Sequence, residues 1–267
     1  MPLKKYIPLW ALCSFLFSAT GLFAWGEEGH KIVAEIAKRH LDKDTLAAVT
    51  DALEGDSFED ASIWMDEVRK ESRYFHMATW HYINLEKGEE YVKNKEENSV
   101  NELRRAVKQL NNRKKYSKKD TAKHIKIIFH LIGDLHQPLH NGYGSDRGGN
   151  NVKVEYNGNE TNLHGLWDYE IISAKKITAA ECMKLKAALS ADDIKAIEKL
   201  NVVDWFKQSR AFVDQAYEIG DGKITEAYVD KNAEVIKKQM LYGGMRLAAI
   251  LKRLYKKGAE KTKDESQ

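Results

Sequence analysis

Residues 120–140 read DTAKHIKIIFHLIGDLHQPLH, and their pattern indicates the fold class. Its hydrophobic residues recur at the three- and four-residue spacing that places them on one face of a helix. Pro138 cannot continue such a helix, because it has no amide hydrogen and its ring clashes with the preceding turn. We therefore predict a long, strongly apolar helix over about residues 120–136.

Helical spacing extends over most of the chain on both sides of this segment. A second long helix is expected over about residues 230–256, and Ser/Thr-x-x-Glu patterns that begin at Ser99 and Thr178 predict two further helix starts. Residues 141–151 are rich in Gly and Asn, which indicates a loop, and the alternation that follows predicts a small β-hairpin near residues 152–161. The expected fold is all-α, a single multihelical domain with one hairpin.

Length and composition exclude several classes of protein. The chain has 267 residues, of which 43% are hydrophobic and 31% charged, so wholesale disorder is excluded. A disulfide scaffold is also excluded, since only two cysteines occur, Cys13 and Cys182. The formal charge of +3 argues against a protein that holds polyanions by its bulk charge.

The N-terminus has the features of a secretory signal peptide. Lys4 and Lys5 precede an apolar run that ends near Ala24, a small residue. We predict a cleaved leader over residues 1–24, a catalytic domain over 25–255, a mobile charged tail over 256–267, and a secreted or periplasmic protein without a membrane span. The alternative is an uncleaved membrane anchor.

Histidine and aspartate recur at a spacing that suits metal ligands. His130 and Asp134 are four residues apart on the apolar helix, His164 and Asp168 repeat this spacing, and His140 follows the end of the helix. No Lys or Arg lies within four residues of Asp134, and an uncompensated buried carboxylate costs several kcal/mol. A divalent cation would compensate the charge, and nitrogen and oxygen donors without thiolate fit catalytic zinc.

Three more segments upstream hold candidate ligands. Asp66 lies in WMDEVR (residues 64–69), His81 lies in WHYIN (80–84), and WGEEGH (25–30) begins the predicted mature chain. Each has an ordinary interpretation when taken alone, because Asp66 and Arg69 could form an exposed helical ion pair and the tryptophans could be core residues.

Taken together, these segments resemble the S1/P1 family of zinc-dependent nucleases that prefer single strands. The matching segments follow the family's order and are WG…H (25–30), WMDEVR (64–69), WHYI (80–83), HLIGDLHQPLH (130–140), DRGGN (146–150) and NLHGLWD (162–168). Weaker similarity continues to the last helix, and the resemblance implies the multihelical fold that these nucleases share with zinc phospholipase C.

The resemblance also implies three Zn²⁺ ions in one cleft. The ligands of the first would be Asp66, His81, His130 and Asp134. The ligands of the second would be His140, His164 and Asp168. The third would be bound by His30 and by the α-amine and carbonyl oxygen of Trp25, which leader cleavage exposes, and Asp134 would bridge the first and third ions. Four histidines match no ligand position: His40 and His124 are expected at the surface or its boundary, and His76 and His136 in packing or behind the ligands.

The implied activity is that of an endonuclease and 3′-nucleotidase. Zinc-bound hydroxide would hydrolyse RNA, single-stranded DNA and 3′-mononucleotides to products with 5′-phosphates where a phosphodiester is cut. Asp66 would orient the hydroxide, Arg69 would contact the phosphoryl oxygens, and Tyr82 would stack on a base. Asn84 stands where characterised members have an acidic residue that contacts the base. A monomer without a stable protein partner is expected.

Two other functions are compatible with the same metal ligands. One is a phosphodiesterase of the zinc phospholipase C type, although in those enzymes the first His lies further from the terminus and a Glu replaces the last Asp. His30 and Asp168 therefore favour the nuclease. The other is a secreted, non-catalytic zinc-binding protein, which would need neither Arg69 nor Tyr82.

Overall fold

The computed structural model describes residues 25–255. The predicted signal peptide and the predicted charged tail therefore lie outside the described residues. Within residues 25–255, no helix combines the length and the apolar composition that crossing a membrane requires.

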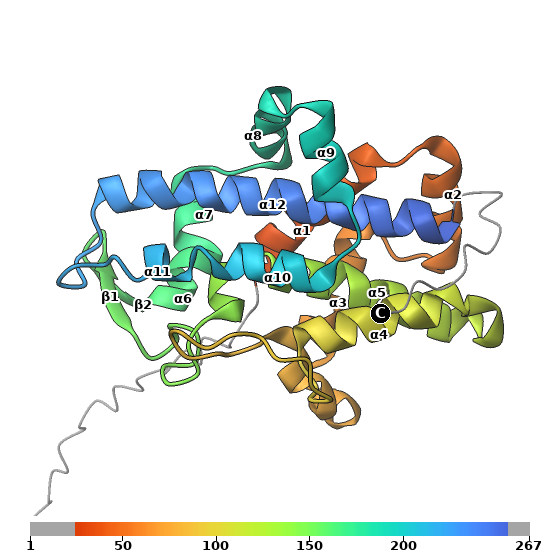
Figure 1. The fold of residues 1–267 in the computed structure, drawn as a ribbon, viewed down its shortest axis with the longest axis horizontal. Coiled ribbons are helices and arrows are strands. Elements are labelled where there is room, and N and C mark those ends of the chain that lie inside the picture. Colours follow the sequence, from red (N-terminus) through yellow and green to blue (C-terminus); the bar gives the residue numbers. More distant parts are fainter. Residues whose placement is uncertain (1–24, 256–267) are drawn as a thin grey trace, which may run out of the picture.

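Helices account for most of the described chain, and one two-stranded sheet completes it (Figure 1). The helices before the sheet are α1 (Glu27–His40), α2 (Lys43–Ala52), α3 (Phe58–Val68), η1 (Ser72–His81), α4 (Ser99–Asn111), η2 (Arg113–Lys115), α5 (Lys118–Leu135) and η3 (Pro138–Asn141). The strands are β1 (Lys153–Tyr156) and β2 (Asn159–Asn162). The helices after the sheet are α6 (Leu163–Gly165), η4 (Leu166–Glu170, a π-helix), α7 (Ile171–Ala174), α8 (Ala179–Lys184), η5 (Leu185–Ala188), α9 (Ala191–Glu198), α10 (Val202–Arg210), α11 (Val213–Ala216) and α12 (Glu226–Tyr255).

The all-α prediction is confirmed, and so is the hairpin, whose antiparallel register pairs Lys153 with Asn162 and Tyr156 with Asn159. The helix predicted over 120–136 is α5. It begins at Lys118, because Ser117 accepts a hydrogen bond from the Asp120 N–H at 3.1 Å and so caps the first turn.

The two predicted helix starts have different outcomes. The Thr178 hydroxyl accepts from the Glu181 N–H at 3.2 Å and caps α8, as expected. The start predicted at Ser99 is wrong by one residue, because the Asn98 side chain caps α4 by accepting from the Asn101 N–H at 3.0 Å. Asn is as good a cap as Ser, so the spacing to Glu102 gave the wrong register.

The longest helix, α12, runs across the whole molecule and packs along α1, while α4 and α5 lie side by side below it (Figure 1). α1 and α12 approach closely at Gly244, where a Cβ atom would lie 2.4 Å from Cγ2 of Ile36. α5 packs against α3 and α4 and also contacts α1 and α12, and its hydrophobic residues are buried from Ile125 to Leu135. This burial places the polar residues of its last two turns inside the molecule.

Candidate metal centre

Three groups of buried His and Asp side chains converge near the C-terminal end of α5. Their ligand atoms lie within 4.8 Å of one another in each group, and the groups are His30, His130 and Asp134; Asp66, His81 and His130; and His140, His164 and Asp168. They contain all eight His and Asp residues that the sequence singled out. The residues come from seven elements, namely α1, α3, η1, α5, η3, α6 and η4.

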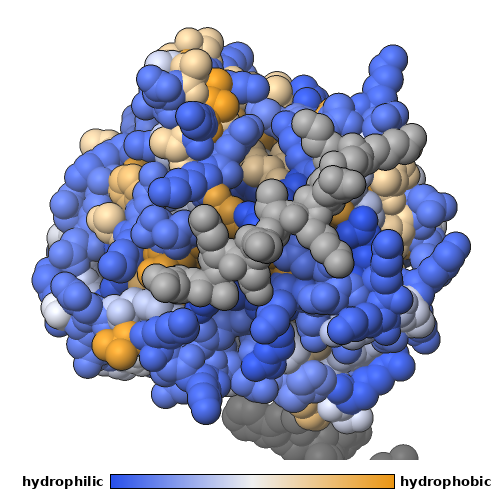
Figure 2. Space-filling model, turned by 45° about the vertical axis from the view of Figure 1, so that its right-hand side comes forward, coloured by the Kyte–Doolittle hydropathy of each residue, from blue (hydrophilic) through white to orange (hydrophobic). Residues whose placement is uncertain are grey.

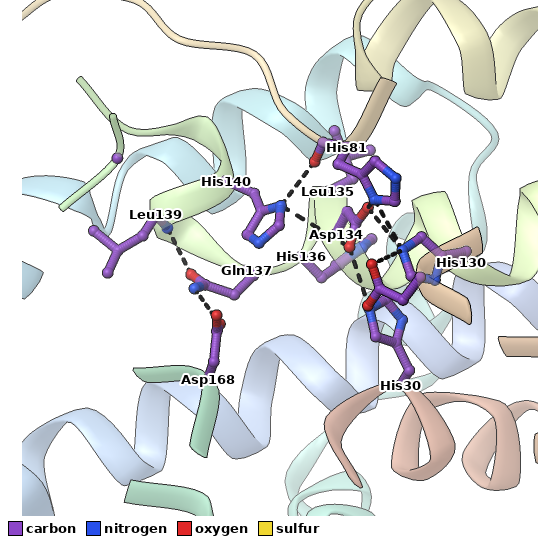
Figure 3. Close-up of polar contacts among 12 residues, drawn as sticks. His30, His81, His130, Asp134, Leu135, His136, Gln137, Leu139, His140 and Asp168 are labelled. Carbon is purple, nitrogen blue, oxygen red and sulfur yellow. Dashed lines mark hydrogen bonds and ion pairs between the residues drawn. The ribbon is translucent and has the colours of Figure 1, made fainter. Parts of the chain in front are cut away.

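Asp134 belongs to the first group and lies against histidines of both the first and the second (Figure 3). Its Oδ2 atom is 3.0 Å from Nδ1 of His81 and 3.3 Å from Nε2 of His130. Its Oδ1 atom lies 3.2 Å from Nε2 of His30. Asp66 lies on the other side of His130, with its Oδ1 atom 3.8 Å from Nε2 of that histidine. One carboxylate therefore faces two sets of donors through its two oxygens.

The third group lies beside the first two. Nε2 of His164 is 3.1 Å from Nε2 of His140 and 3.3 Å from Oδ2 of Asp168. Nδ1 of His140 lies 3.9 Å from Oδ1 of Asp134, which connects this group to the others. The three groups thus form one continuous centre.

Backbone carbonyls set the orientation of three imidazoles. Nδ1 of His130, His140 and His164 lies 2.7, 2.7 and 2.6 Å from the carbonyl oxygens of Ser62, His81 and Gly148, respectively. A carbonyl oxygen only accepts, so each Nδ1 donates a proton and each Nε2 presents a lone pair to the centre. Histidines that bind metals usually have their other ring nitrogen fixed in this way.

Several polar atoms of the centre make no hydrogen bond of good geometry within the described residues, even where two of them lie close together, as Oδ1 of Asp134 and Nε2 of His30 do at 3.2 Å. These atoms are Nδ1 and Nε2 of His30, Oδ1 of Asp66 and Oδ1 of Asp134. Buried polar atoms are normally paired, because leaving one unpaired costs about 1–3 kcal/mol or more. Unpaired lone pairs that converge from opposite sides are what a bound cation would satisfy.

Burial also shifts the ionisation of the centre. It raises the pKa of the Asp134 and Asp168 carboxyls well above their usual value. It lowers the pKa of the His30, His81 and His140 imidazoles, and it lowers the pKa of His164 to about 4. A divalent cation would favour the ionised carboxylates and would bind the neutral imidazoles, so it suits this donor set.

A glycine inside α5 makes room for His30. A Cβ atom at Gly133 would lie 2.5 Å from Nδ1 of His30, and the His30 ring stacks on the His130 ring with centroids 4.0 Å apart. Glycine in a helix interior costs roughly 0.8–1.0 kcal/mol relative to alanine. Here the smaller residue lets α1 approach α5 closely enough for His30 to reach Asp134.

Trp25 lies next to the centre and is fully buried. The Gly26 N–H donates to the Asp168 carbonyl oxygen at 3.2 Å, and a Cβ atom at Gly26 would lie 2.1 Å from the Tyr169 ring. The start of the described chain is therefore held against η4, beside one of the candidate ligands.

The three predicted substrate-contacting residues lie around the same centre. Nη1 of Arg69 is 3.7 Å from Oδ1 of Asp66, and the arginine side chain is 23% exposed. Tyr82 follows His81 directly and is 40% exposed. Asn84 is half-buried, and the Ile83 N–H between these two residues donates to the His140 carbonyl oxygen at 2.9 Å.

Gln137 is a residue that the sequence interpretation missed. Its side chain is fully buried, Nε2 donates to Oδ1 of Asp168 at 2.7 Å, and Oε1 accepts from the Leu139 N–H at 2.6 Å (Figure 3). Because Oε1 caps η3, which contains His140, one amide connects two members of the third group. The position of Gln137 directly before Pro138, at the start of a helical turn, is the signal that could have identified it.

His136 and His76, two histidines that match no ligand position, differ in burial. His136 is fully buried as expected, donates from Nδ1 to the Ile132 carbonyl oxygen at 2.7 Å and accepts from Nη1 of Arg246 at 2.6 Å. His76 is exposed and contacts the Trp80 ring edge-on, with ring centroids 5.4 Å apart, so it packs at the surface and does not lie behind the candidate ligands.

Comparisons with known proteins identify the family of the chain. The sequence model of the family described as S1/P1 Nuclease matches residues 25–256. The chain is 29% identical to Endonuclease 2 of Arabidopsis thaliana, over 90% of this chain and 93% of the relative. It is 24% identical to Nuclease S1 of Aspergillus oryzae, over 93% of this chain and 97% of the relative.

Among solved structures, an alpha-toxin of Clostridium perfringens is similar at 14% identity and a TM-score of 0.47, over 87% of this chain and 66% of the toxin chain. The family match extends over essentially all the described residues and includes every candidate ligand. The chain belongs to the S1/P1 nuclease family.

Proposed function

We propose that this protein is a secreted or periplasmic zinc-dependent endonuclease and 3′-nucleotidase. It hydrolyses phosphoric ester bonds in RNA, single-stranded DNA and 3′-mononucleotides and acts as a monomer. The main support is the convergence of eight buried nitrogen and oxygen donors on one centre in a member of a nuclease family.

The donor chemistry favours zinc. Five imidazoles and three carboxylates contribute, and no thiolate does, which is the composition of catalytic zinc sites. The three groups would hold three ions: one at Asp66, His81, His130 and Asp134, one at His140, His164 and Asp168, and one at His30 with Asp134 and Trp25. The burial of Trp25 and its position beside Asp168 are consistent with ligation by its α-amine once the leader has been removed.

When bound, zinc lowers the pKa of coordinated water to about 7 and neutralises charge on phosphoryl oxygens. The protein contributes orientation and further positive charge. Asp66 lies at the edge of the centre with a side chain that is only 10% exposed, so it can orient a water molecule without solvent competition. Arg69 lies one helical turn from Asp66 and can donate to phosphoryl oxygens as negative charge develops on them.

Tyr82 provides a surface for stacking a base beside the scissile bond. Its exposure and its position after His81 place an aromatic ring at the rim of the centre. Stacking on one base is worth about 1–3 kcal/mol and tolerates any base. The anchored backbone of Ile83 holds Tyr82 and Asn84 next to η3, where Asn84 can contact the edge of that base.

The decisive experiment compares substrates with the purified mature protein. We expect hydrolysis of single-stranded DNA, RNA and a 3′-mononucleotide, 5′-phosphate ends on the cleaved strands, and no turnover of phosphatidylcholine. Preferred turnover of phosphatidylcholine would instead identify a phospholipase, and zinc binding without any hydrolysis would identify a zinc-binding protein.

Arg69→Lys tests the contact with phosphoryl oxygens. Lysine keeps the charge but loses the planar fork of donors, so kcat/KM on single-stranded DNA should fall by roughly one order of magnitude, with zinc content unchanged. The matched control is Lys70→Ala at the neighbouring exposed position, which should leave kcat/KM unaltered. Wild-type kinetics in the Arg69→Lys variant would remove this residue from the proposed mechanism.

Gln137→Met tests whether the amide positions Asp168 and His140. Methionine has a similar volume but donates no hydrogen bond, so zinc affinity should fall by roughly 10–100-fold, as is typical when a partner of a metal ligand is lost. The control is Gln239→Met, because Gln239 is equally buried but donates at 3.1 Å to the His136 backbone rather than to a candidate ligand. Competition against a metal buffer measures the affinity, and an equal loss in both variants would indicate general disruption of packing.

A further inference from the structure

Positive charge is concentrated in one part of the chain. The whole sequence has 43 Lys and Arg against 40 Asp and Glu, but residues 104–126 hold ten of the basic residues and a single acidic one, Asp120. The remainder therefore has 33 basic and 39 acidic residues, a formal charge of −6, whereas this segment has +9. We call the Lys and Arg side chains of residues 104–126 the basic ridge.

The basic ridge covers the end of the molecule where α4 and α5 join. It includes the second half of α4, all of η2 and the first half of α5. Lys114, Lys115, Lys118 and Lys119 are exposed, and within residues 25–255 none of them forms an ion pair with a carboxylate. In Figure 2 this end of the molecule is turned toward the viewer, and the visible surface is mostly hydrophilic. Unpaired like charges repel one another, so such a cluster favours an anionic partner.

One face of α5 connects the basic ridge to the metal centre. Lys119 and Lys123 precede His130 by eleven and seven residues, so the three side chains lie along the same stripe of the helix. Lys126 lies on this stripe too, but it forms an ion pair with Asp56 and its side chain is only 16% exposed, so its charge is already compensated. At the rise of an α-helix, Lys119 is about 17 Å from His130 along the axis. A strand held at Lys119 can therefore reach the centre within a few nucleotides.

Aromatic rings lie along the same route. Nζ of Lys123 is 5.2 Å from the centroid of the Tyr74 ring, and Cζ of Arg73 is 4.9 Å from it. Tyr74 belongs to η1, the helix that ends at the candidate ligand His81, and its neighbour Phe75 is 61% exposed. Tyr116, within the ridge, is 37% exposed. Positive charge with exposed aromatic rings is the combination that binds single-stranded nucleic acid without sequence preference.

We propose that the basic ridge is a second anchoring surface for single-stranded nucleic acid, which binds phosphates several nucleotides away from the scissile bond. The proposal rests on the proposed nuclease function. It also revises what the net charge indicated, since a bulk charge of +3 conceals a local charge of +9 on a chain that is otherwise negative. A long strand gains contacts at both surfaces, whereas a mononucleotide reaches only the metal centre.

Charge reversal at four exposed positions tests the proposal. The ridge variant combines Lys114→Glu, Lys115→Glu, Lys118→Glu and Lys119→Glu. The control variant combines Lys195→Glu, Lys199→Glu, Lys207→Glu and Lys223→Glu, four exposed lysines outside the ridge, and makes the same change in net charge. We measure kcat/KM on a 20-nucleotide single strand and on a 3′-mononucleotide, at several salt concentrations.

For the ridge variant we expect kcat/KM on the 20-nucleotide strand to fall by at least about tenfold at low salt, with the mononucleotide rate unchanged. The dependence of log(kcat/KM) on log salt should become shallower by about 2–3, since each phosphate contact on a single strand contributes about 0.7. The control variant should keep at least half of the wild-type rate on the long strand. Equal losses in both variants, or an equal loss on the mononucleotide, would overturn the proposal.

A second measurement separates the ridge from catalysis. Stopped-flow association of a fluorescently labelled 20-nucleotide strand reports binding before cleavage, so it remains informative if the protein hydrolyses no nucleic acid. Slower association of the ridge variant alone supports the proposal. If the ridge variant associates with the strand normally but no longer binds vesicles with anionic lipids, the ridge is a membrane contact and the proposal is wrong.

Discussion

Replacing Asp134 with asparagine should lower the hydrolysis of single-stranded DNA by roughly a thousandfold. Asp134 places one oxygen 3.0 Å from Nδ1 of His81 and the other 3.2 Å from Nε2 of His30, so it faces donors from two of the three groups. Asparagine keeps the shape but offers only one oxygen and no charge. Losing a Lewis acid worth several kcal/mol of transition-state stabilisation corresponds to a rate loss of this size.

The control for this variant is Asp120→Asn, on the same helix. Asp120 is exposed and accepts a hydrogen bond from the Ser117 hydroxyl at 2.6 Å, far from the metal centre. We expect near-normal activity and zinc content in the control, and a clear loss of zinc from Asp134→Asn by elemental analysis. Near-normal hydrolysis by Asp134→Asn would contradict a metal centre organised around this carboxylate.

Whether Asp134→Asn is more or less stable than the wild type should depend on the presence of metal. Burial raises the pKa of the Asp134 carboxyl, so in the absence of a cation the ionised form destabilises the folded state. The neutral amide removes this penalty. With chelator at pH 7, Asp134→Asn should therefore melt at the same temperature as the wild type or higher, and with zinc it should melt lower. A variant that is merely misfolded would melt lower under both conditions.

Removing the metal from the wild-type protein should abolish hydrolysis and lower the melting temperature at neutral pH. A ligand that binds only the folded state stabilises it by RT ln(1 + [L]/Kd), which is about 4 kcal/mol at a thousandfold excess over Kd. Differential scanning calorimetry with and without chelator measures this difference. An unchanged melting temperature, together with undiminished hydrolysis of single-stranded DNA in chelator, would contradict the metal centre.

The zinc-loaded protein should lose stability as the pH falls below about 6.5, and the sign follows from the imidazoles. An unfolded histidine has a pKa near 6.5, whereas burial lowers the pKa of folded His164 to about 4. Between these values unfolding takes up a proton, so acid favours the unfolded, metal-free chain. His30, His81 and His140 shift in the same direction. The melting temperature of the zinc-loaded protein should therefore fall as the pH drops from about 6.5 to about 4.

The metal-free protein should also lose stability as the pH rises from acid. The raised pKa values of Asp134 and Asp168 mean that both carboxyls are protonated in the folded state at a pH where the unfolded chain is already ionised. The stability that these two protonated carboxyls contribute is fully present below pH 3.9, which is about the pKa of an unfolded aspartate. It is lost as the pH rises through their higher pKa values in the folded state. Bound metal should reverse this trend, because it binds the ionised carboxylates.

Local physical chemistry explains which structural features could be predicted from the residues alone. The spacing of hydrophobic residues around Ile125 and Ile132 determines a buried helix whatever surrounds it, and Asn157-Gly158 determines a tight turn, so α5 and the hairpin were predictable. The start of α4 was not, because Asn98 and Ser99 are both good caps and only the folded chain selects between them.

The candidate ligands could be selected from the sequence because spacing and family resemblance pointed to the same eight His and Asp residues. Their relative positions could not, since seven elements far apart in the chain supply them. Gln137 and Gly133 show the same limit: a glutamine before a proline and a glycine in a helix have ordinary explanations until Asp168 and His30 are seen beside them.

Residue spacing and the order of the motifs along the chain were enough to predict the helical class, the hairpin, the family and the candidate ligands. The tertiary structure was needed to show that both oxygens of Asp134 face donors and that Gln137 connects Asp168 to η3. Such relations depend on how separate helices pack, and packing is determined by the whole core rather than by any one segment.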